Sequence, residues 1–449
     1  MHLQPARAER ARPGGSGCAE GQGRGNPAVL PERGARGASR AKSEVSTREM
    51  HIDSQRRIDR FVGAPLCRLL SILPGARDEA KDASPPRKIL VILLSEMGSL
   101  VLAQPMFDRI QEKYPEASVY ALVFRKNKEV LDLLEAIPEE NVLTLRDDTL
   151  PHLMTDALGS VRALRRLGID TVLDCELFSR VSAILSFLTG ANRRVGFERH
   201  TQEGLYRGSF LNHPVLYNPY HHIARQFLTL VEAVERRGRP LAKRSAEGEE
   251  VGIRPLRLRG DELDEMRRRI ESDFPVVRGA RLVLVYPGGG LIPVRAWPLT
   301  SFQELVSALA HRGFVVGIIG LGEDRPLAAA IRDSSGPERT IDLTGYTRTV
   351  RELMLVFHLA ELLVTNDGGP GHFAAMTPIR AIVLYGPETP LLYGSLDPRS
   401  ASLFSHLSCS PCLTAYNHRN SPCDGDNQCL KVIRPEEVLE RALAMLGGS

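Results

Sequence analysis

Residues 88–110 read KILVILLSEMGSLVLAQPMFDRI, and this stretch decides the fold class. It begins with an uninterrupted apolar run of strand length at 89–94, and a short turn follows at 95–99. Residues 100–114 then carry apolar side chains at helical spacing. A fully apolar strand joined directly to a helix is typical of a parallel sheet that helices cover on both faces. The stretch therefore predicts an α/β fold.

The same alternation of strands and helices extends over most of the chain in two blocks. A polar, charged stretch at 235–250 separates the blocks and is the best candidate for a linker. A chain of 449 residues is too long for one hydrophobic core, because cores stop growing at about 250–300 residues. We predict two Rossmann-like domains with parallel sheets, at 86–250 and 251–449, that face a central cleft. The expected strands lie at 89–94, 119–124, 142–145, 171–174, 282–286, 314–319, 362–365 and 381–385.

Two further segments precede these domains. Residues 1–49 consist mainly of Gly, Ala, Arg, Pro and Ser, and cannot bury enough apolar surface to offset the entropy of ordering. We expect them to form a disordered extension. Residues 50–85 mix cationic and apolar side chains at partly helical spacing, which Pro65 interrupts. This basic amphipathic segment is either a short helix packed on the folded body or a contact with a membrane surface.

The charge distribution excludes one class of function. The formal net charge is +4, and the seven Arg and three Glu among the first 40 residues account for all of it. A nucleic-acid-binding body needs a basic face on a folded domain, so we expect no nucleic-acid partner. The chain has no apolar run of about 18 residues, and its N-terminus lacks the apolar centre of a signal peptide. We expect a cytoplasmic protein, with a peripheral contact at the inner membrane as the alternative.

Three glycine-containing loops follow predicted strands of the second block. Strands of a parallel sheet end at one edge, where ligands of α/β proteins bind. Glycines let the backbone approach a ligand closely, and amides at a helix start suit a phosphate. The loops therefore predict an anionic ligand, although tight turns alone would also explain them. They lie at 287–290, 366–372 and 385–389.

Arg295 follows the first of these loops, where its guanidinium could bind a diphosphate through paired hydrogen bonds. The alternative is a solvated surface arginine. Trp297, the only tryptophan, is expected to pack at a helix start. The chain has no GxxxxGK[ST] loop, and no GxGxxG follows the first strand, which argues against kinases and dinucleotide-dependent oxidoreductases.

These features together resemble glycosyltransferase family 9, the heptosyltransferase-like enzymes of bacterial lipopolysaccharide assembly, over about residues 50–445. The resemblance implies a GT-B fold, a nucleoside-diphosphate sugar bound mainly by the C-terminal domain, inversion at the anomeric carbon, and no metal or other cofactor for catalysis. ADP-heptose is a donor that the family suggests. The motifs are KILVILLSEMGSLVLAQPMFDRI, YPGGGLIPVRAWPLTSFQEL, LTGYTRTVRELMLVFHLAELLVTNDGGPGHFAAM and VLYGPE.

The resemblance also assigns residues to a donor site. Arg295 matches the basic residue that faces the donor diphosphate, and two loops match those that surround the donor. The expected donor-binding residues are Gly288, Gly289, Arg295, Thr344, Gly345, Asp367, Gly368, Gly369 and His372.

The catalytic base departs from the family pattern. The first loop of the family usually ends in Gly-Asp, and that aspartate is the proposed base, whereas this chain has Gly98-Ser99. A serine cannot deprotonate an acceptor hydroxyl unaided at neutral pH. Glu96 offers a carboxylate in the same loop, so we expect Glu96 to act as the base beside Ser99. The alternative is that Glu96 only complements the helix dipole.

The acceptor is expected to be a glycan or a lipid-linked glycan. Its contacts are expected from the N-terminal domain, on the polar stretches 193–200 and 203–208, which could equally be solvated loops. Two other functions stay open. A nucleotide-sugar epimerase or hydrolase would use the same scaffold, and loss of the Gly-Asp acid would also suit a catalytically silent glycan-binding protein.

Four cysteines in the loop 409–429 have the spacing C-x2-C-x10-C-x5-C. Four thiols this close together are typical of metal ligands, and disulfides are unexpected in a reducing compartment. We expect either a structural zinc or iron–sulfur centre, or thiols without a ligand. The cysteines are Cys409, Cys412, Cys423 and Cys429.

Overall fold

The computed structural model separates residues 1–47 from residues 48–449, and every residue described below belongs to the second unit. The expected extension 1–49 and most of the expected linker 235–250 lie outside the described residues. The described residues are 59–73, 84–94, 96–177, 179–198, 206–236, 242, 251–290, 292–415, 421 and 423–447.

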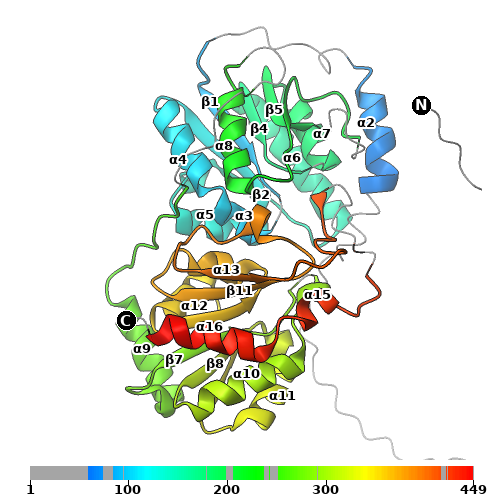
Figure 1. Cartoon of the computed structure of the whole chain (residues 1–449). Coiled ribbons are helices and arrows are strands. Elements are labelled where there is room, and N and C mark those ends of the chain that lie inside the picture. Colours follow the sequence, from blue (N-terminus) through cyan, green and yellow to red (C-terminus); the bar gives the residue numbers. More distant parts are fainter. Residues whose placement is uncertain are drawn as a thin grey trace, which may run out of the picture. The chain divides into compact units, whose positions relative to one another are not determined.

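The first sheet has six parallel strands in the order β3-β2-β1-β4-β5-β6, as Figure 1 shows in part. The order reverses between β1 and β4, and this reversal is where ligands of open α/β sheets bind. The strands are β1 Lys88–Ile92, β2 Ser118–Phe124, β3 Val142–Leu145, β4 Thr171–Asp174, β5 Arg193–Glu198 and β6 His213–Leu216. Its helices are α3 Met97–Leu102, α4 Gln104–Lys113, α5 Lys128–Leu134, α6 Leu150–Leu167, α7 Arg180–Leu188 and α8 Ile223–Ala233, with the short turns η2 Arg125–Asn127 and η3 Glu139–Asn141.

The second sheet repeats this plan with the order β12-β11-β10-β7-β8-β9, again fully parallel. The C-terminal helix α16 packs on α10 over this sheet (Figure 1). The strands are β7 Leu282–Tyr286, β8 Val315–Gly320, β9 Thr340–Thr344, β10 Leu362–Asn366, β11 Arg380–Tyr385 and β12 Ala401–Phe404. The helices are α9 Glu262–Asp273, α10 Leu299–His311, α11 Arg325–Ser335, α12 Val350–His358, α13 Gly369–Ala374, α14 Pro390–Tyr393, α15 Gln428–Lys431 and α16 Pro435–Gly447, with η4 Pro275–Val277, η5 Pro293–Arg295 and η6 Gly322–Asp324.

Burial on both faces explains the uninterrupted apolar runs. In β1, Val91 belongs to the core under α3 and α4, whereas its neighbours Leu90 and Ile92 belong to the core under α6. Successive side chains of a strand point to opposite faces, so a strand covered on both sides needs apolar residues throughout. In β7, Leu284 and Val285 likewise lie in different cores. The prediction of two parallel α/β sheets is confirmed.

One predicted surface is a strand instead. Residues 193–198, expected within an acceptor-contact stretch, form β5 in the first sheet, and Arg193 and Arg194 are buried. Their guanidinium groups donate to backbone carbonyls, with Arg194 Nη1 at 2.7 Å from Ala191 O and Arg193 Nη2 bound to Ser84 O. A buried arginine is tolerated when carbonyls accept its hydrogen bonds in this way. These two arginines therefore stabilise the fold from inside it, and the expected solvated loop is a buried strand here.

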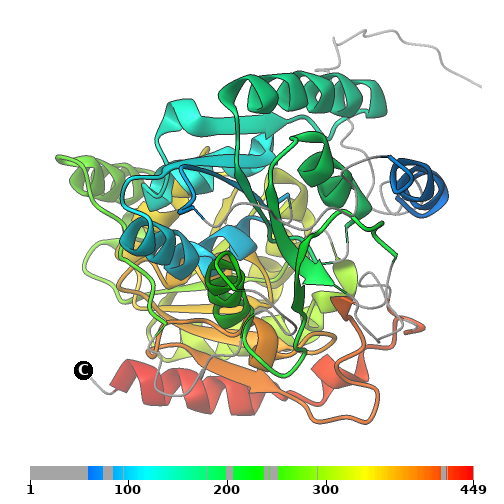
Figure 2. The same cartoon turned by 90° about the horizontal axis from the view of Figure 1, so that it is seen from above.

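The amphipathic segment contains a helix. The π-turn η1 Asp59–Gly63 leads into α2 Ala64–Leu70, which contacts α7 beside the first sheet (Figures 1 and 2). Cys67 is fully buried there against Ala183 and Ile184 of α7. One side of the segment thus packs on the folded body. Within the part of the chain that the structure describes, no helix is long and apolar enough to cross a membrane.

Candidate active site

The first loop of the first sheet meets the second sheet at a glycine. Gly98, in the first turn of α3, faces the imidazole of His372 in α13. A Cβ atom at Gly98 would lie 2.4 Å from His372 Cδ2, closer than two such atoms can approach. The family's Gly at this position is therefore needed for α3 and α13 to touch.

Arg295 lies among three carboxylates in this region. It ends η5, just after β7, and its side chain is buried, which rules out the solvated surface arginine. Its Nη2 lies 2.6 Å from Glu388 Oε2, and its Nη1 lies 3.2 Å from Glu96 Oε2. Its Nε lies 3.7 Å from Asp367 Oδ2. One cation thus binds carboxylates from three loops, two from the second sheet and one from the first.

The protonation of this cluster follows from its burial. Burial raises the pKa of Asp367 well above its ordinary value, Arg295 opposes that rise, and the nearby Glu388 carboxylate adds to it. Burial also lowers the pKa of His372 to about 4, so the imidazole is neutral at neutral pH. Arg295 is therefore the positive charge of the cluster, and it lies against the carboxyl groups of Glu96 and Glu388.

Asn366 holds the glycine loop in place, a role that the sequence analysis missed. Its Nδ2 donates to Gly288 O at 2.9 Å and to Pro287 O at 3.1 Å, and its Oδ1 accepts from Trp297 N at 3.0 Å. A side chain added at Gly289 would lie 2.9 Å from Pro293 Cα. The one signal for Asn366 in the sequence is a polar residue at the end of an apolar strand.

Trp297 packs as predicted. It is buried at the start of α10, its Nε1 donates to Ile433 O at 2.9 Å, and its ring meets Phe302 edge-on. Trp297 therefore stabilises the segment that contains Arg295.

Thr344 and Gly345 lie apart from this cluster. Thr344 ends β9 and Gly345 follows it, and β9 is two strands away from β7, or about 10 Å at the usual strand spacing. Thr344 Oγ1 donates to Asp342 Oδ1 at 2.6 Å, and Gly345 has φ of 64°, a conformation that favours glycine. The structure thus gathers Glu96, Arg295, Asp367 and His372, and leaves this pair further along the same edge.

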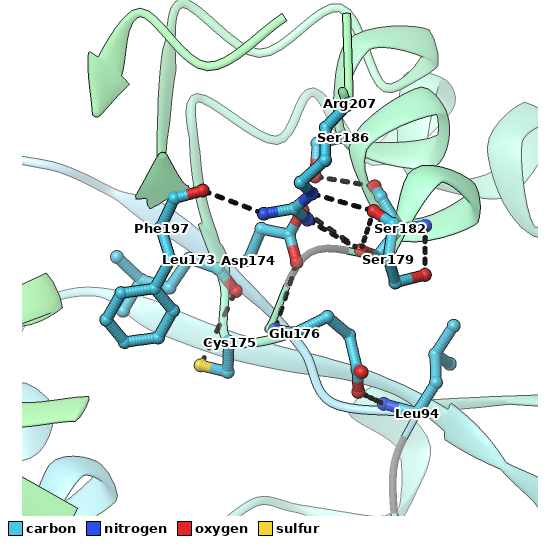
Figure 3. Close-up of polar contacts among 10 residues, drawn as sticks. All are labelled: Leu94, Leu173, Asp174, Cys175, Glu176, Ser179, Ser182, Ser186, Phe197 and Arg207. Atoms are coloured by element: carbon cyan, nitrogen blue, oxygen red, sulfur yellow. Dashed lines mark hydrogen bonds and ion pairs between the residues drawn. The ribbon is translucent and has the colours of Figure 1, made fainter. Parts of the chain in front are cut away.

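A buried ion pair lies at the end of β4 (Figure 3). Asp174 is fully buried, binds Arg207, and accepts a hydrogen bond from Ser182 Oγ at 3.1 Å. Arg207 also donates to Phe197 O at 3.0 Å and to Ser179 O at 2.7 Å. Arg207 belongs to the expected acceptor stretch 203–208, yet it is buried in this network and serves the fold. Residues 199–205 lie outside the described residues.

Glu176 connects this network to the first loop. Its Oε1 accepts from the backbone N–H of Leu94 at 2.6 Å, and its own N–H donates to Asp174 Oδ1 at 3.1 Å (Figure 3). Leu94 lies two residues before Glu96. Glu176 is therefore a positioning residue for the start of that loop.

The metal centre expected at Cys409, Cys412, Cys423 and Cys429 is not supported. Among the described residues, no three His, Cys, Asp or Glu side chains are placed to bind a metal ion. Cys429 is buried beside Leu430, and burial raises the pKa of its thiol, to which Cys412, Cys409 and Cys423 add. Cys412 Sγ lies 3.1 Å from Ser421 Oγ, and Cys423 is exposed.

The family model of glycosyltransferase family 9 (heptosyltransferase) matches residues 159–421, more than half of the chain. The chain belongs to glycosyltransferase family 9. The match spans parts of both sheets, including Arg295 and the loop that contains Asp367 and His372.

Relatives and solved structures of family 9 extend the similarity over most of the chain. Lipopolysaccharide heptosyltransferase 2 of Salmonella typhimurium is 23% identical over 377 residues, which cover 80% of this chain and 98% of the relative. Its counterpart in Escherichia coli K12 is 22% identical over 369 residues, with the same coverage of both chains.

Solved structures confirm the GT-B fold. The structure of E. coli ADP-heptose LPS heptosyltransferase II matches with a TM-score of 0.60 at 19% identity, covering 80% of this chain and 98% of that one. A family 9 protein of Veillonella parvula matches with a TM-score of 0.61 at 17% identity, covering 82% of this chain and all of the other.

Proposed function

We propose that this chain is an inverting glycosyltransferase that transfers a heptose from ADP-heptose to a lipopolysaccharide-type acceptor. The observation that carries the proposal is the 3.2 Å contact between Glu96 and Arg295. It joins the loop after β1 of one sheet to the segment after β7 of the other. The names of the relatives, which are lipopolysaccharide heptosyltransferases, support the donor and the acceptor class.

The donor diphosphate binds Arg295 and the backbone amides of the neighbouring glycine loops. Arg295 is fixed from behind by Glu388, whose side chain is 3% exposed, whereas the Glu96 side chain is 32% exposed. An incoming diphosphate therefore displaces Glu96 and leaves Glu388 in place. Gly288, Gly289, Gly368 and Gly369 let the diphosphate approach the backbone, and Asp367 and His372 line this site. Thr344 and Gly345, further along the edge, take the nucleoside side of the donor.

Displacement of Glu96 frees the catalytic base. The released carboxylate removes the proton from an acceptor hydroxyl as that oxygen attacks the anomeric carbon from the face opposite the diphosphate. A carbon–oxygen bond to the acceptor forms, the bond from the anomeric carbon to the diphosphate oxygen breaks, and Glu96 holds the proton. Arg295 stabilises the departing diphosphate, so the transfer needs no metal ion. Ser99, at the family's aspartate position, has no part in the proton transfer.

The donor and the reaction are tested together. A thermal-shift screen of nucleoside-diphosphate sugars identifies the donor, because a ligand of the native state raises the unfolding temperature. We expect ADP-heptose to give the largest shift, and we expect ADP release to require a lipopolysaccharide core acceptor. The product should have the anomeric configuration opposite to that of the donor. ADP release without an acceptor would instead identify a hydrolase or an epimerase.

A further inference from the structure

The helix α2 exposes an apolar face to solvent. Five large side chains between residues 62 and 73 are 39% to 80% exposed. Successive helical residues turn by about 100°, which brings positions 62, 66, 69 and 73 to one side of the helix. The hydrogen bonds from Ile72 N to Leu69 O and from Leu73 N to Leu70 O continue the turn beyond the helix end. The α2 face consists of Val62, Leu66, Leu69, Ile72 and Leu73.

The opposite side of α2 is fixed to the folded body. Cys67 packs into a small core with α7 and Phe210, and Ser71 Oγ lies 3.3 Å from Tyr206 Oη. The backbone N–H of Ser209 also donates to Ser71 Oγ at 3.3 Å. A helix at a protein surface normally turns polar side chains to solvent. In α2 the folded body covers only the side of Cys67, so the α2 face is exposed to solvent on a helix that is fixed in place.

A second copy of the chain does not suit the α2 face. In both views, none of the elements that the structure describes lies beyond the outer side of α2 (Figures 1 and 2). The face is one short helix wide, whereas a specific dimer interface buries about 800 Å² on each partner. Arg68 lies beside the face and is exposed, so two copies would bring like charges together.

The charge of Arg68 suits an anionic lipid surface instead. Arg68 is exposed and, from its position in the helix, borders the α2 face on the side of Ile72. Interfacial helices insert an apolar face among the acyl chains and keep cationic side chains at the headgroups. Each cation near an anionic surface adds attraction, and apolar insertion adds more. The helix α2 has both an exposed apolar face and a cationic side chain beside it.

The position of α2 in the fold connects it to the catalytic edge. Its partner Tyr206 immediately precedes Arg207, which binds Asp174 at the end of β4. Glu176, next to Asp174 at that edge, holds the start of the loop of Glu96. A surface that binds α2 would therefore hold the side of the first sheet from which the proposed base extends.

We propose that the α2 face docks this protein on an anionic lipid bilayer and presents the catalytic edge to acceptors anchored in that bilayer. The docking rests on the exposed apolar side chains and on Arg68 beside them, whereas the delivery of acceptors rests on the proposed function. The helix lies in the headgroup region, with the side chains of Leu69 and Ile72 among the acyl chains and Arg68 at the phosphates.

Vesicle sedimentation of the full-length protein tests the docking. We expect the protein to sediment with phosphatidylcholine vesicles that contain phosphatidylglycerol, and less with phosphatidylcholine alone. The double variant Leu69→Glu, Ile72→Glu should lower the partition coefficient at least about tenfold, because anions replace two apolar side chains that would insert into the bilayer. Leu321→Glu is the matched control, since Leu321 is as exposed as Leu69, at 65% against 64%, but lies after β8. It should change the coefficient less than about twofold.

Three results would overturn the docking: no sedimentation of the unmodified protein with either vesicle, equal binding by the double variant, or a dimer in solution that the double variant dissociates. Transfer assays separate this proposal from the proposed function. The double variant should transfer sugar normally to a detergent-dispersed acceptor and poorly to an acceptor in vesicles. Absence of transfer by every protein, with vesicle binding intact, would remove the proposed function and leave the docking.

Discussion

Arg295 is the residue on which the site depends, and its environment differs from a simple phosphate clamp. The sequence predicts that it binds a diphosphate, and the structure surrounds it with Glu96, Asp367 and Glu388. A buried cation needs such partners, because burying a charge without compensation costs several kcal/mol. The difference in exposure between Glu96 and Glu388 then decides which carboxylate a diphosphate can replace.

The burial of His372 predicts how the free energy of unfolding depends on pH. Its pKa is about 4 in the folded protein and about 6.5 in an unfolded chain. Between these values the unfolded state binds more protons, so stability is fully present above about pH 6.5 and is lost as the pH falls towards 4. From pH 7 to pH 5, this group should remove about 2 kcal/mol of unfolding free energy. Urea unfolding at both pH values measures the loss.

The variant His372→Gln isolates that contribution. It cannot take up a proton, so its unfolding free energy should fall less than that of the unmodified protein over the same interval. Titrating groups outside this cluster behave alike in both proteins and cancel in the comparison. Parallel losses in the two proteins would show that His372 is not held neutral by burial.

At the scale of elements, the loop after β4 depends on the ion pair between Asp174 and Arg207. Arg207→Met should destabilise the protein by about 3–5 kcal/mol, because it leaves a buried carboxylate without its cation. Adding Asp174→Asn removes the stranded charge and should recover part of that loss. Denaturant unfolding of the single and double variants checks both statements, and a single variant as stable as the unmodified protein would contradict them.

Some strands could be predicted from the sequence and others could not. The strands β1 and β7 were predictable, because burial on both faces demands an apolar run. The strand β5 was not, because Arg193 and Arg194 look exposed in sequence and are buried only through backbone carbonyls that tertiary folding supplies. A pattern of side chains along one segment contains no information about acceptors on another.

The residues of the candidate site were also predictable only in part. The loops of Glu96, Arg295, Asp367 and His372 were predictable, since each follows a strand at a sheet edge. The partners Glu388 and Asn366 lay inside recognised motifs without an assigned role, because their roles depend on which loops become neighbours. The four cysteines had metal-ligand spacing, but spacing does not fix where thiols point, and the described thiols form no metal site.

At the scale of the whole molecule, two similar sheets divide the proposed reaction between them. The second sheet presents Arg295 and its glycine loops to the donor, and the first sheet presents Glu96 to the acceptor. The contact between Glu96 and Arg295 connects the two tasks in this proposal, because one guanidinium binds either the base or the diphosphate. Donor binding and release of the base are thereby the same event.

The turnover of Glu96→Gln tests this account most directly. The substitution keeps the shape of the side chain and removes the proton acceptor, so kcat should fall by roughly 10² to 10⁴-fold. The donor should bind at least as tightly as before, because it no longer has to displace a carboxylate from Arg295. Ser99→Ala is the matched control in the same loop and should change kcat far less. Near-normal turnover in Glu96→Gln would contradict the account, and it would transfer the role of base to another carboxylate of the first sheet.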